Sequence, residues 1–106
     1  MIHLTDIKEL SDLINSNEKV VLFWTANWCP DCNVIKPDLP LIEEAFSDVK
    51  FIQADRDEFI DLAREMMILG IPSFIAFKDG VEVSRYVDKS RKTRAEVEDF
   101  ITKAFS

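Results

Sequence analysis

The chain has 106 residues, 47% of them hydrophobic with eight Phe and two Trp, which suits one domain over 1–106 with a substantial core. Its net charge of −7 argues against binding nucleic acid or anionic membranes, because phosphate contacts need clustered Lys and Arg. The first residues have no basic stretch before an apolar run, and no run approaches the ~18 apolar residues of a membrane span. We therefore expect a monomer located in the reducing cytoplasm.

Hydrophobic periodicity and capping signals predict strands and helices that alternate along the chain. In the first half they are an edge strand over 2–4, a helix over 6–15 with an Asp6–Glu9 capping box, a buried strand over 20–24, and a helix from Cys29 or Pro30 to 46, interrupted at Pro37 and Pro40. In the second half they are a strand over 49–54, a helix over 57–67, a hairpin of strands over 73–77 and 81–87, and a last helix with a Thr93–Glu96 capping box. This order predicts an α/β protein.

The only two cysteines lie in one tetrad, Cys29-Pro30-Asp31-Cys32, after a buried strand and at the start of a predicted helix. Residues at i and i+3 of a first helical turn share one side, so these thiols are close enough to form a disulfide. One of them can be exposed while the other is covered, which suits two-electron thiol–disulfide exchange. Because a helix N-terminus favours negative charge, we predict Cys29 as the nucleophile and Cys32 as the resolving thiol.

Other interpretations of the cysteine pair are weaker. A zinc site usually needs four Cys or His ligands, and His3 is the only further candidate, so we expect no metal site within one chain, although bridging between chains stays open. A static structural disulfide would close a loop too short to restrain much unfolded chain. Two inert buried thiols would require this spacing to arise by chance.

Several segments resemble the thioredoxin family, in order and at similar spacing. They are Thr25-Ala26-Asn27-Trp28-Cys29-Pro30-Asp31-Cys32, Pro37, Gly70-Ile71-Pro72-Ser73-Phe74 and Phe77-Lys78-Asp79-Gly80. The resemblance implies a thioredoxin fold, a central mixed β-sheet flanked by helices on both faces, with a cis peptide bond before Pro72. It also implies that Trp28, Ile71 and Pro72 contact the substrate, while Pro30 and Asp31 tune the cysteines.

The implied function is reduction of protein disulfides through a Cys29/Cys32 dithiol–disulfide cycle that needs no other cofactor. The implied partners are disulfide-containing client proteins, with a thioredoxin reductase or a low-molecular-weight thiol as electron donor. Two alternatives stay open. The chain could be a dedicated redox protein with a single client, or a non-catalytic binding or assembly module whose docking is sensitive to the redox state.

The sequence departs from the family at buried charges. Phe23 occupies the position of the buried Asp that relays a proton for the resolving cysteine, and Phe51 occupies the position of its Lys partner. Asp31 replaces a residue of the usual Gly-Pro dipeptide. It is either a substitute proton acceptor or a solvated carboxylate that stabilises the helix start. As a negative charge it also opposes thiolate formation at Cys29.

A third departure follows the last strand, where Asp88 replaces a family Gly. Basic residues gather around this loop, namely Arg85, Lys89, Arg91, Lys92 and Arg94. They form either an ordinary solvated loop or a positive patch on the catalytic face that attracts acidic partners and favours the thiolate.

Overall fold

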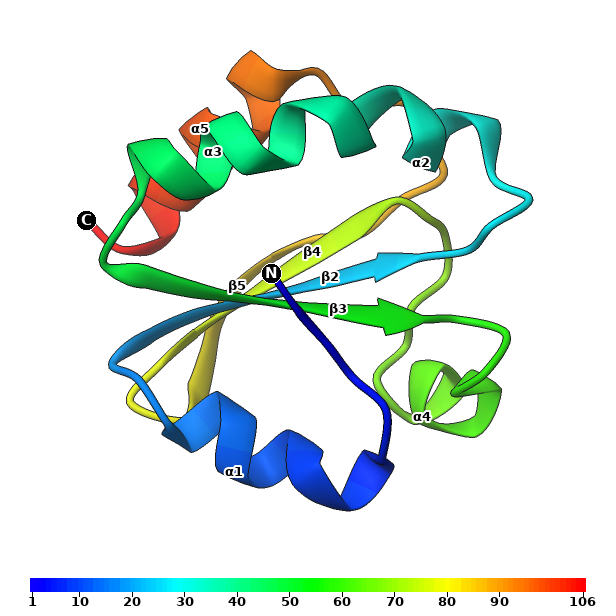
Figure 1. The fold of residues 1–106 in the computed structure, drawn as a ribbon, viewed down its shortest axis with the longest axis horizontal. Coiled ribbons are helices and arrows are strands. Elements are labelled where there is room, and N and C mark those ends of the chain that lie inside the picture. Colours follow the sequence, from blue (N-terminus) through cyan, green and yellow to red (C-terminus); the bar gives the residue numbers. More distant parts are fainter.

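The computed structural model describes residues 1–106, which form one five-stranded mixed sheet in the order β1-β3-β2-β4-β5 (Figure 1). The strands are β1 (Ile2–His3), β2 (Lys19–Thr25), β3 (Val49–Asp55), β4 (Ser73–Lys78) and β5 (Val81–Tyr86). The pairs β1–β3 and β2–β3 are parallel, whereas β2–β4 and β4–β5 are antiparallel. The predicted strands therefore all exist, with ends that differ by at most one residue.

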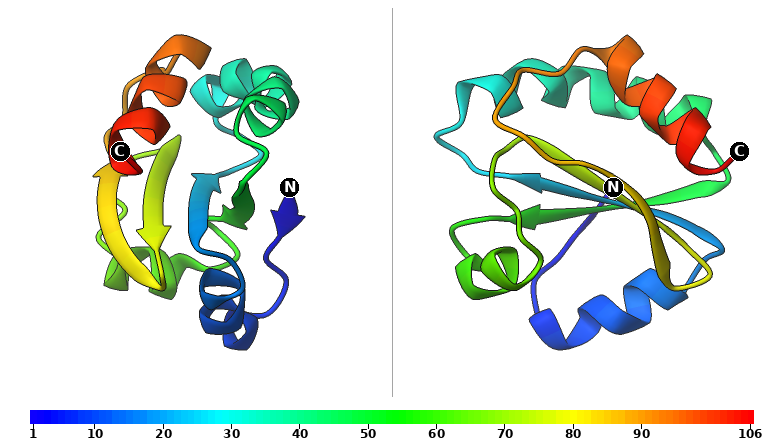
Figure 2. Two further views of the ribbon diagram at one scale, coloured as in Figure 1. Left: turned by 90° about the vertical axis from the view of Figure 1, so that its left-hand side faces the viewer. Right: turned by 180° about the vertical axis from the view of Figure 1, so that it is seen from behind.

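Helices cover both faces of the sheet, as predicted (Figures 1 and 2). One face carries the 3-10 turn η1 (Ile7–Glu9), α1 (Leu10–Asn15) and α4 (Ile60–Glu65). The other face carries α2 (Pro30–Ile35), the 3-10 turn η2 (Lys36–Asp38), α3 (Leu39–Ala45) and α5 (Arg94–Ala104). None of these helices has the length and hydropathy that crossing a membrane requires.

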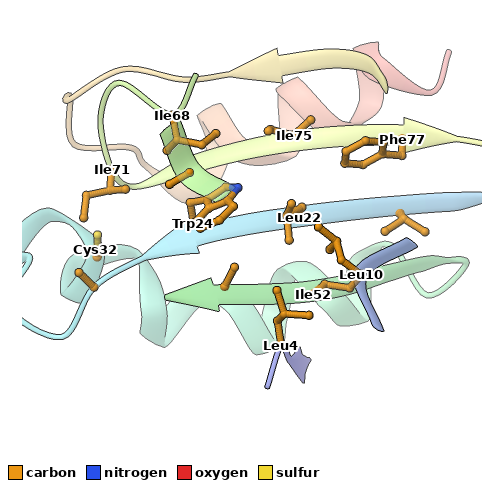
Figure 3. Close-up of a cluster of buried hydrophobic side chains, with 14 of the residues drawn as sticks. Leu4, Leu10, Leu22, Trp24, Cys32, Ile52, Ile68, Ile71, Ile75 and Phe77 are labelled. Atoms are coloured by element: carbon orange, nitrogen blue, oxygen red, sulfur yellow. The ribbon is translucent and has the colours of Figure 1, made fainter. Parts of the chain in front are cut away.

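Strand β2 runs through the centre of the sheet and separates two apolar cores. Alternate side chains of a strand point to opposite faces. Leu22 and Trp24 therefore pack into the core beneath α1 and α4 (Figure 3), while Val21 and Phe23 pack into the core beneath α3 and α5. All four side chains are fully buried, which explains why this segment is apolar throughout.

The helix predicted from Cys29 or Pro30 to residue 46 has one break, and its three prolines lie at the two helix starts and in that break. Pro30 stands at the first position of α2, where no backbone donor is needed, and Pro37 lies in the 3-10 turn η2 that separates α2 from α3. Pro40 lies in the first turn of α3, so the chain resumes an α-helix there. The helical segment from Pro30 to Ala45 is therefore interrupted at η2.

Two helix starts differ from prediction. The helix predicted over 57–67 spans Ile60–Glu65. It begins late because Asp55 Oδ1 accepts hydrogen bonds from the backbone N–H groups of Asp57 and Glu58 and holds a turn there. At the N-terminus, Asp6 accepts from the backbone N–H of Lys8, so a 3-10 turn forms instead of the predicted capping box. The Thr93–Glu96 capping box of α5 is confirmed.

Candidate active site

The cysteine tetrad lies where β2 leads into α2, at one end of the sheet (Figures 1 and 3). Cys29 is the N-cap of α2, and Cys32 lies inside its first turn. The two residues form a disulfide, with 5.2 Å between their Cα atoms. The predicted pairing is therefore confirmed, and it places a two-electron redox centre at a helix N-terminus.

The two sulfur atoms have different surroundings. Cys29 is 4% exposed and lines a surface groove, whereas Cys32 is completely buried. The backbone N–H of Cys32 points at Cys29 Sγ, with 3.1 Å between N and S. A donor aimed at sulfur stabilises the thiolate over the thiol. These contacts favour Cys29 as the attacking thiol, with Cys32 as the thiol that resolves the mixed disulfide.

The loop before β4 faces the cysteines from a distant part of the chain. The Ile71–Pro72 peptide bond is cis, as predicted, and the Ile71 carbonyl oxygen lies 3.9 Å from Cys29 Sγ. The Ser73 hydroxyl donates to the Gly70 carbonyl oxygen and ties the two sides of this loop together. Ile71 lines the groove beside Cys29, while Pro72 is buried behind it.

The groove at Cys29 has a volume of about 350 Å³. Its lining is formed by Trp28, Cys29, Pro30, Asp31, Arg56, Leu69, Gly70, Ile71 and Lys89. All the predicted site residues except Cys32 and Pro72 thus meet at one surface. Substrate contact by Trp28, Ile71 and Pro72 remains a prediction.

Trp28 forms one wall of the groove with its side chain 58% exposed. Its Nε1 donates to Asp57 Oδ2 at 2.5 Å, and the Arg56 guanidinium lies 5.0 Å from a ring centroid of the indole. These contacts hold the indole in one orientation. Trp24 instead is fully buried in the core and has no place in the groove.

Arg56, Asp57 and Leu69 were missed by the sequence interpretation. A signal for the first two existed, because the turn after β3 begins with Asp55, whose carboxylate caps the backbone of Asp57. No signal existed for Leu69, since its 72% exposure follows from the path of the loop before Pro72.

The loop after β5 reaches the active site. Arg91 Nε lies 3.1 Å from Asp31 Oδ1, so a cation from this loop pairs with the carboxylate between the two cysteines. The interpretation as an ordinary solvated loop is wrong for Lys92, whose side chain is completely buried and bonds to Asp88 Oδ1 at 2.8 Å. The hydrogen bond from Lys92 lowers the pKa of Asp88 to about 2, with a smaller contribution from Ser90.

Phe23 and Phe51, which replace the family's buried Asp and its Lys partner, both pack in an apolar core. Phe23 is fully buried in the core beneath α3 and α5, where its ring stacks on Phe74 with 4.9 Å between centroids. Phe51 belongs to the same core. No charged group is left unpaired there by the exchange. No group of three or more His, Cys, Asp or Glu side chains is placed to hold a metal ion.

A cysteine pair at a helix N-terminus, faced by a cis-proline loop on a sheet of this strand order, defines the thioredoxin-fold class of dithiol proteins. The thioredoxin family model matches residues 2–103. The chain therefore belongs to the thioredoxin family, whose members are thiol–disulfide oxidoreductases.

Relatives and solved structures agree with this assignment. Mitochondrial thioredoxin-3 of Saccharomyces cerevisiae is 34% identical over 84 residues, which cover 79% of this chain and 66% of that protein. Thioredoxin H2 of Arabidopsis thaliana is 34% identical, over 81% of this chain and 60% of that protein. The chain thus spans less than two thirds of either relative. The crystal structure of oxidised yeast mitochondrial thioredoxin 3 superposes with a TM-score of 0.86 at 30% identity, covering 97% of this chain and 94% of that one.

Proposed function

We propose that this protein reduces protein disulfides through a dithiol–disulfide cycle of Cys29 and Cys32. The observation that carries the proposal is the asymmetry of the pair. Cys29 lines the groove and receives the backbone N–H of Cys32, whereas Cys32 is completely buried directly behind it. The first thiol must be accessible in order to attack the client disulfide, and the second must lie beside it in order to release the client from the mixed disulfide.

The reaction begins from the reduced dithiol. The Cys29 thiolate attacks one sulfur of the client disulfide, forms a mixed disulfide and expels the other client sulfur, which takes up a proton. Cys32 then gives up its proton and attacks Cys29 Sγ, which breaks the mixed disulfide and releases the second client thiol. Two electrons have passed to the client, and the protein holds the Cys29–Cys32 disulfide found in the structure.

No organic cofactor or metal enters this cycle, since sulfur alone exchanges electrons in each step. The partners we propose are disulfide-containing client proteins and an electron donor, either a thioredoxin reductase or a low-molecular-weight thiol. The proposed location is a reducing compartment, the cytoplasm, where such a donor keeps the pair reduced. We propose that the protein acts as a monomer, because its net charge of −7 disfavours self-association.

Insulin reduction coupled to a thioredoxin reductase tests the proposal. The wild-type protein should turn over, and Cys29→Ser should abolish turnover. Cys32→Ser should accumulate mixed disulfides with clients, because the first attack remains possible and the resolving attack does not. Slow turnover with insulin but fast turnover with one client would indicate a dedicated redox protein. Absence of reduction with every client would indicate a docking module and would refute the reductase assignment.

A further inference from the structure

The loop over residues 88–92 is fixed in place by a buried ammonium group. Lys92 Nζ donates to Asp88 Oδ1 at 2.8 Å and to the Ser90 carbonyl oxygen at 2.9 Å. It also lies 4.7 Å from the centroid of the Tyr86 ring. Because a fully buried cation is stable only while such partners surround it, these contacts hold the loop in one conformation.

This loop lies directly against the cis-proline loop. A Cβ atom added at Gly70 would lie 2.5 Å from the carbonyl carbon of Asp88 and 2.6 Å from the backbone nitrogen of Lys89. Only glycine allows two backbones to come this close. Lys89 is therefore held beside the residue that precedes Ile71, at the rim of the groove.

The charged residues that line the groove are not equally free. The Asp31 carboxylate pairs with Arg91 at 3.1 Å. The Arg56 guanidinium lies over Trp28 and pairs with Asp57 at 3.5 Å. Lys89 makes no ion pair. The groove thus presents one unpaired charge, and that charge is positive although the chain as a whole carries −7.

We propose that this protein prefers protein disulfides flanked by an acidic residue, and that Lys89 is the residue that selects them. The inference rests on the proposed reductase function. A client segment that brings its sulfur to Cys29 passes Ile71, so the residue next to the client cysteine comes to the rim that holds Lys89. A carboxylate there gains the ammonium group as a partner, whereas a lysine there is repelled. The exposed indole of Trp28 and the exposed Leu69 side chain give the groove an apolar surface for the rest of the segment.

Three matched peptides test the preference. Each carries one disulfide-linked quencher and differs only at the residue beside the cysteine, which is Glu, Gln or Lys. We expect kcat/KM of the wild-type protein to fall in the order Glu, Gln, Lys, by about 1.5- to 5-fold at each step, the range for an exposed ion pair. The differences should shrink in 0.5 M salt, because exposed charges are then screened.

Variants of Lys89 should remove and then reverse the order. The Lys89→Gln protein should reduce the three peptides at nearly equal rates. The Lys89→Glu protein should reduce the Lys peptide fastest. Lys8→Glu makes the same change in net charge in the turn before α1, on the other side of the sheet, and should keep the wild-type order. In each of the four proteins, the rates with the Glu and Lys peptides are divided by the rate with the Gln peptide, so that a change in the reactivity of Cys29 itself does not alter the order.

The outcomes separate the two proposals. Efficient reduction of all three peptides without an order, or an order that Lys89→Glu leaves unchanged, would overturn the acidic preference while the reductase function stands. An order that Lys8→Glu also reverses would reflect net charge alone and would overturn the role of Lys89. No reduction of any peptide would refute the reductase function, and the preference with it.

Discussion

Replacing Phe23 with Asp restores the family's acid in a site that no longer supports one. Phe23 is fully buried and packs against Phe74 in an apolar core. The lost packing alone should cost about 3–5 kcal/mol of unfolding free energy. Burial also raises the pKa of the introduced carboxyl, because the core offers no cation. The unfolded chain ionises this group near pH 4, so the loss grows by about 1.4 kcal/mol per pH unit until the pKa in the folded state is reached.

Phe23→Asn is the matched control, because it has nearly the same shape and does not ionise. Urea unfolding at pH 5.5 and pH 7.5, both above the isoelectric point of about 4.6, should show the Asp variant losing up to about 2.7 kcal/mol more between these conditions than the Asn variant. Equal losses for Asp and Asn at both pH values would refute the reasoning. That result would mean that water or a donor reaches this position.

Phe51 supplies a second step of the same experiment. Its strand position is opposite Val21, two residues from the position opposite Phe23, and both rings belong to one core. Adding Phe51→Lys to Phe23→Asp should therefore recover about 0.5–3 kcal/mol relative to the sum of the single losses. Additive losses would show that the two side chains do not face each other.

Three further outcomes are expected around the active-site loop. Asp31→Asn should move the midpoint of the Cys29 thiolate absorbance titration downward by a few tenths of a pH unit, and Arg91→Gln should move it upward, because each removes one charge of an exposed pair. At pH 7, urea unfolding of Asp88→Asn should reveal a loss of about 1–3 kcal/mol, whereas Lys92→Met should stay within about 1 kcal/mol of wild type, since an apolar side chain needs no buried partner. The loss of stability in Asp88→Asn should shrink at low pH. The lowered pKa of Asp88 stabilises the fold fully above about pH 3.8, and this stabilisation disappears as the pH falls through about 2. A thiolate midpoint that both charge variants leave unchanged, or a Lys92→Met loss as large as that of Asp88→Asn, would contradict these assignments.

The catalytic centre was predictable because its signals are local. The spacing of Cys29 and Cys32, the Pro30 at a helix start and the Ile71–Pro72 pair each fix their own backbone within a few residues. Their meeting in space follows from strand order, since β2 and β4 are neighbours in the sheet. Local rules and one topology therefore account for the redox site.

The burial of the Lys92 side chain was not predicted, although the sequence contains one signal for it. Lys92 directly precedes the N-cap Thr93, and a residue at that place often packs against the fourth helical residue, here the buried Val97. A lysine stem can fill such a position, provided that its ammonium group finds acceptors. Asp88, four residues earlier, supplies one, but a carboxylate at that spacing is too common to predict burial. The ion pair of Arg91 with Asp31 spans 60 residues, so no local pattern predicts it.

The departures from the family occur in compensating pairs. If Phe23 had replaced the family's Asp while the family's Lys stayed at position 51, that buried Lys would have no partner. Lys92 would likewise be a buried cation without a carboxylate if Asp88 were absent. Arg91 likewise offsets the negative charge that Asp31 places between the two cysteines. Burying a lone charge destabilises any folded protein, so the first two pairs are explained by the stability of the fold. Only the pair of Arg91 with Asp31 lies beside the thiols, so it is the pair whose disruption should change the reactivity of Cys29.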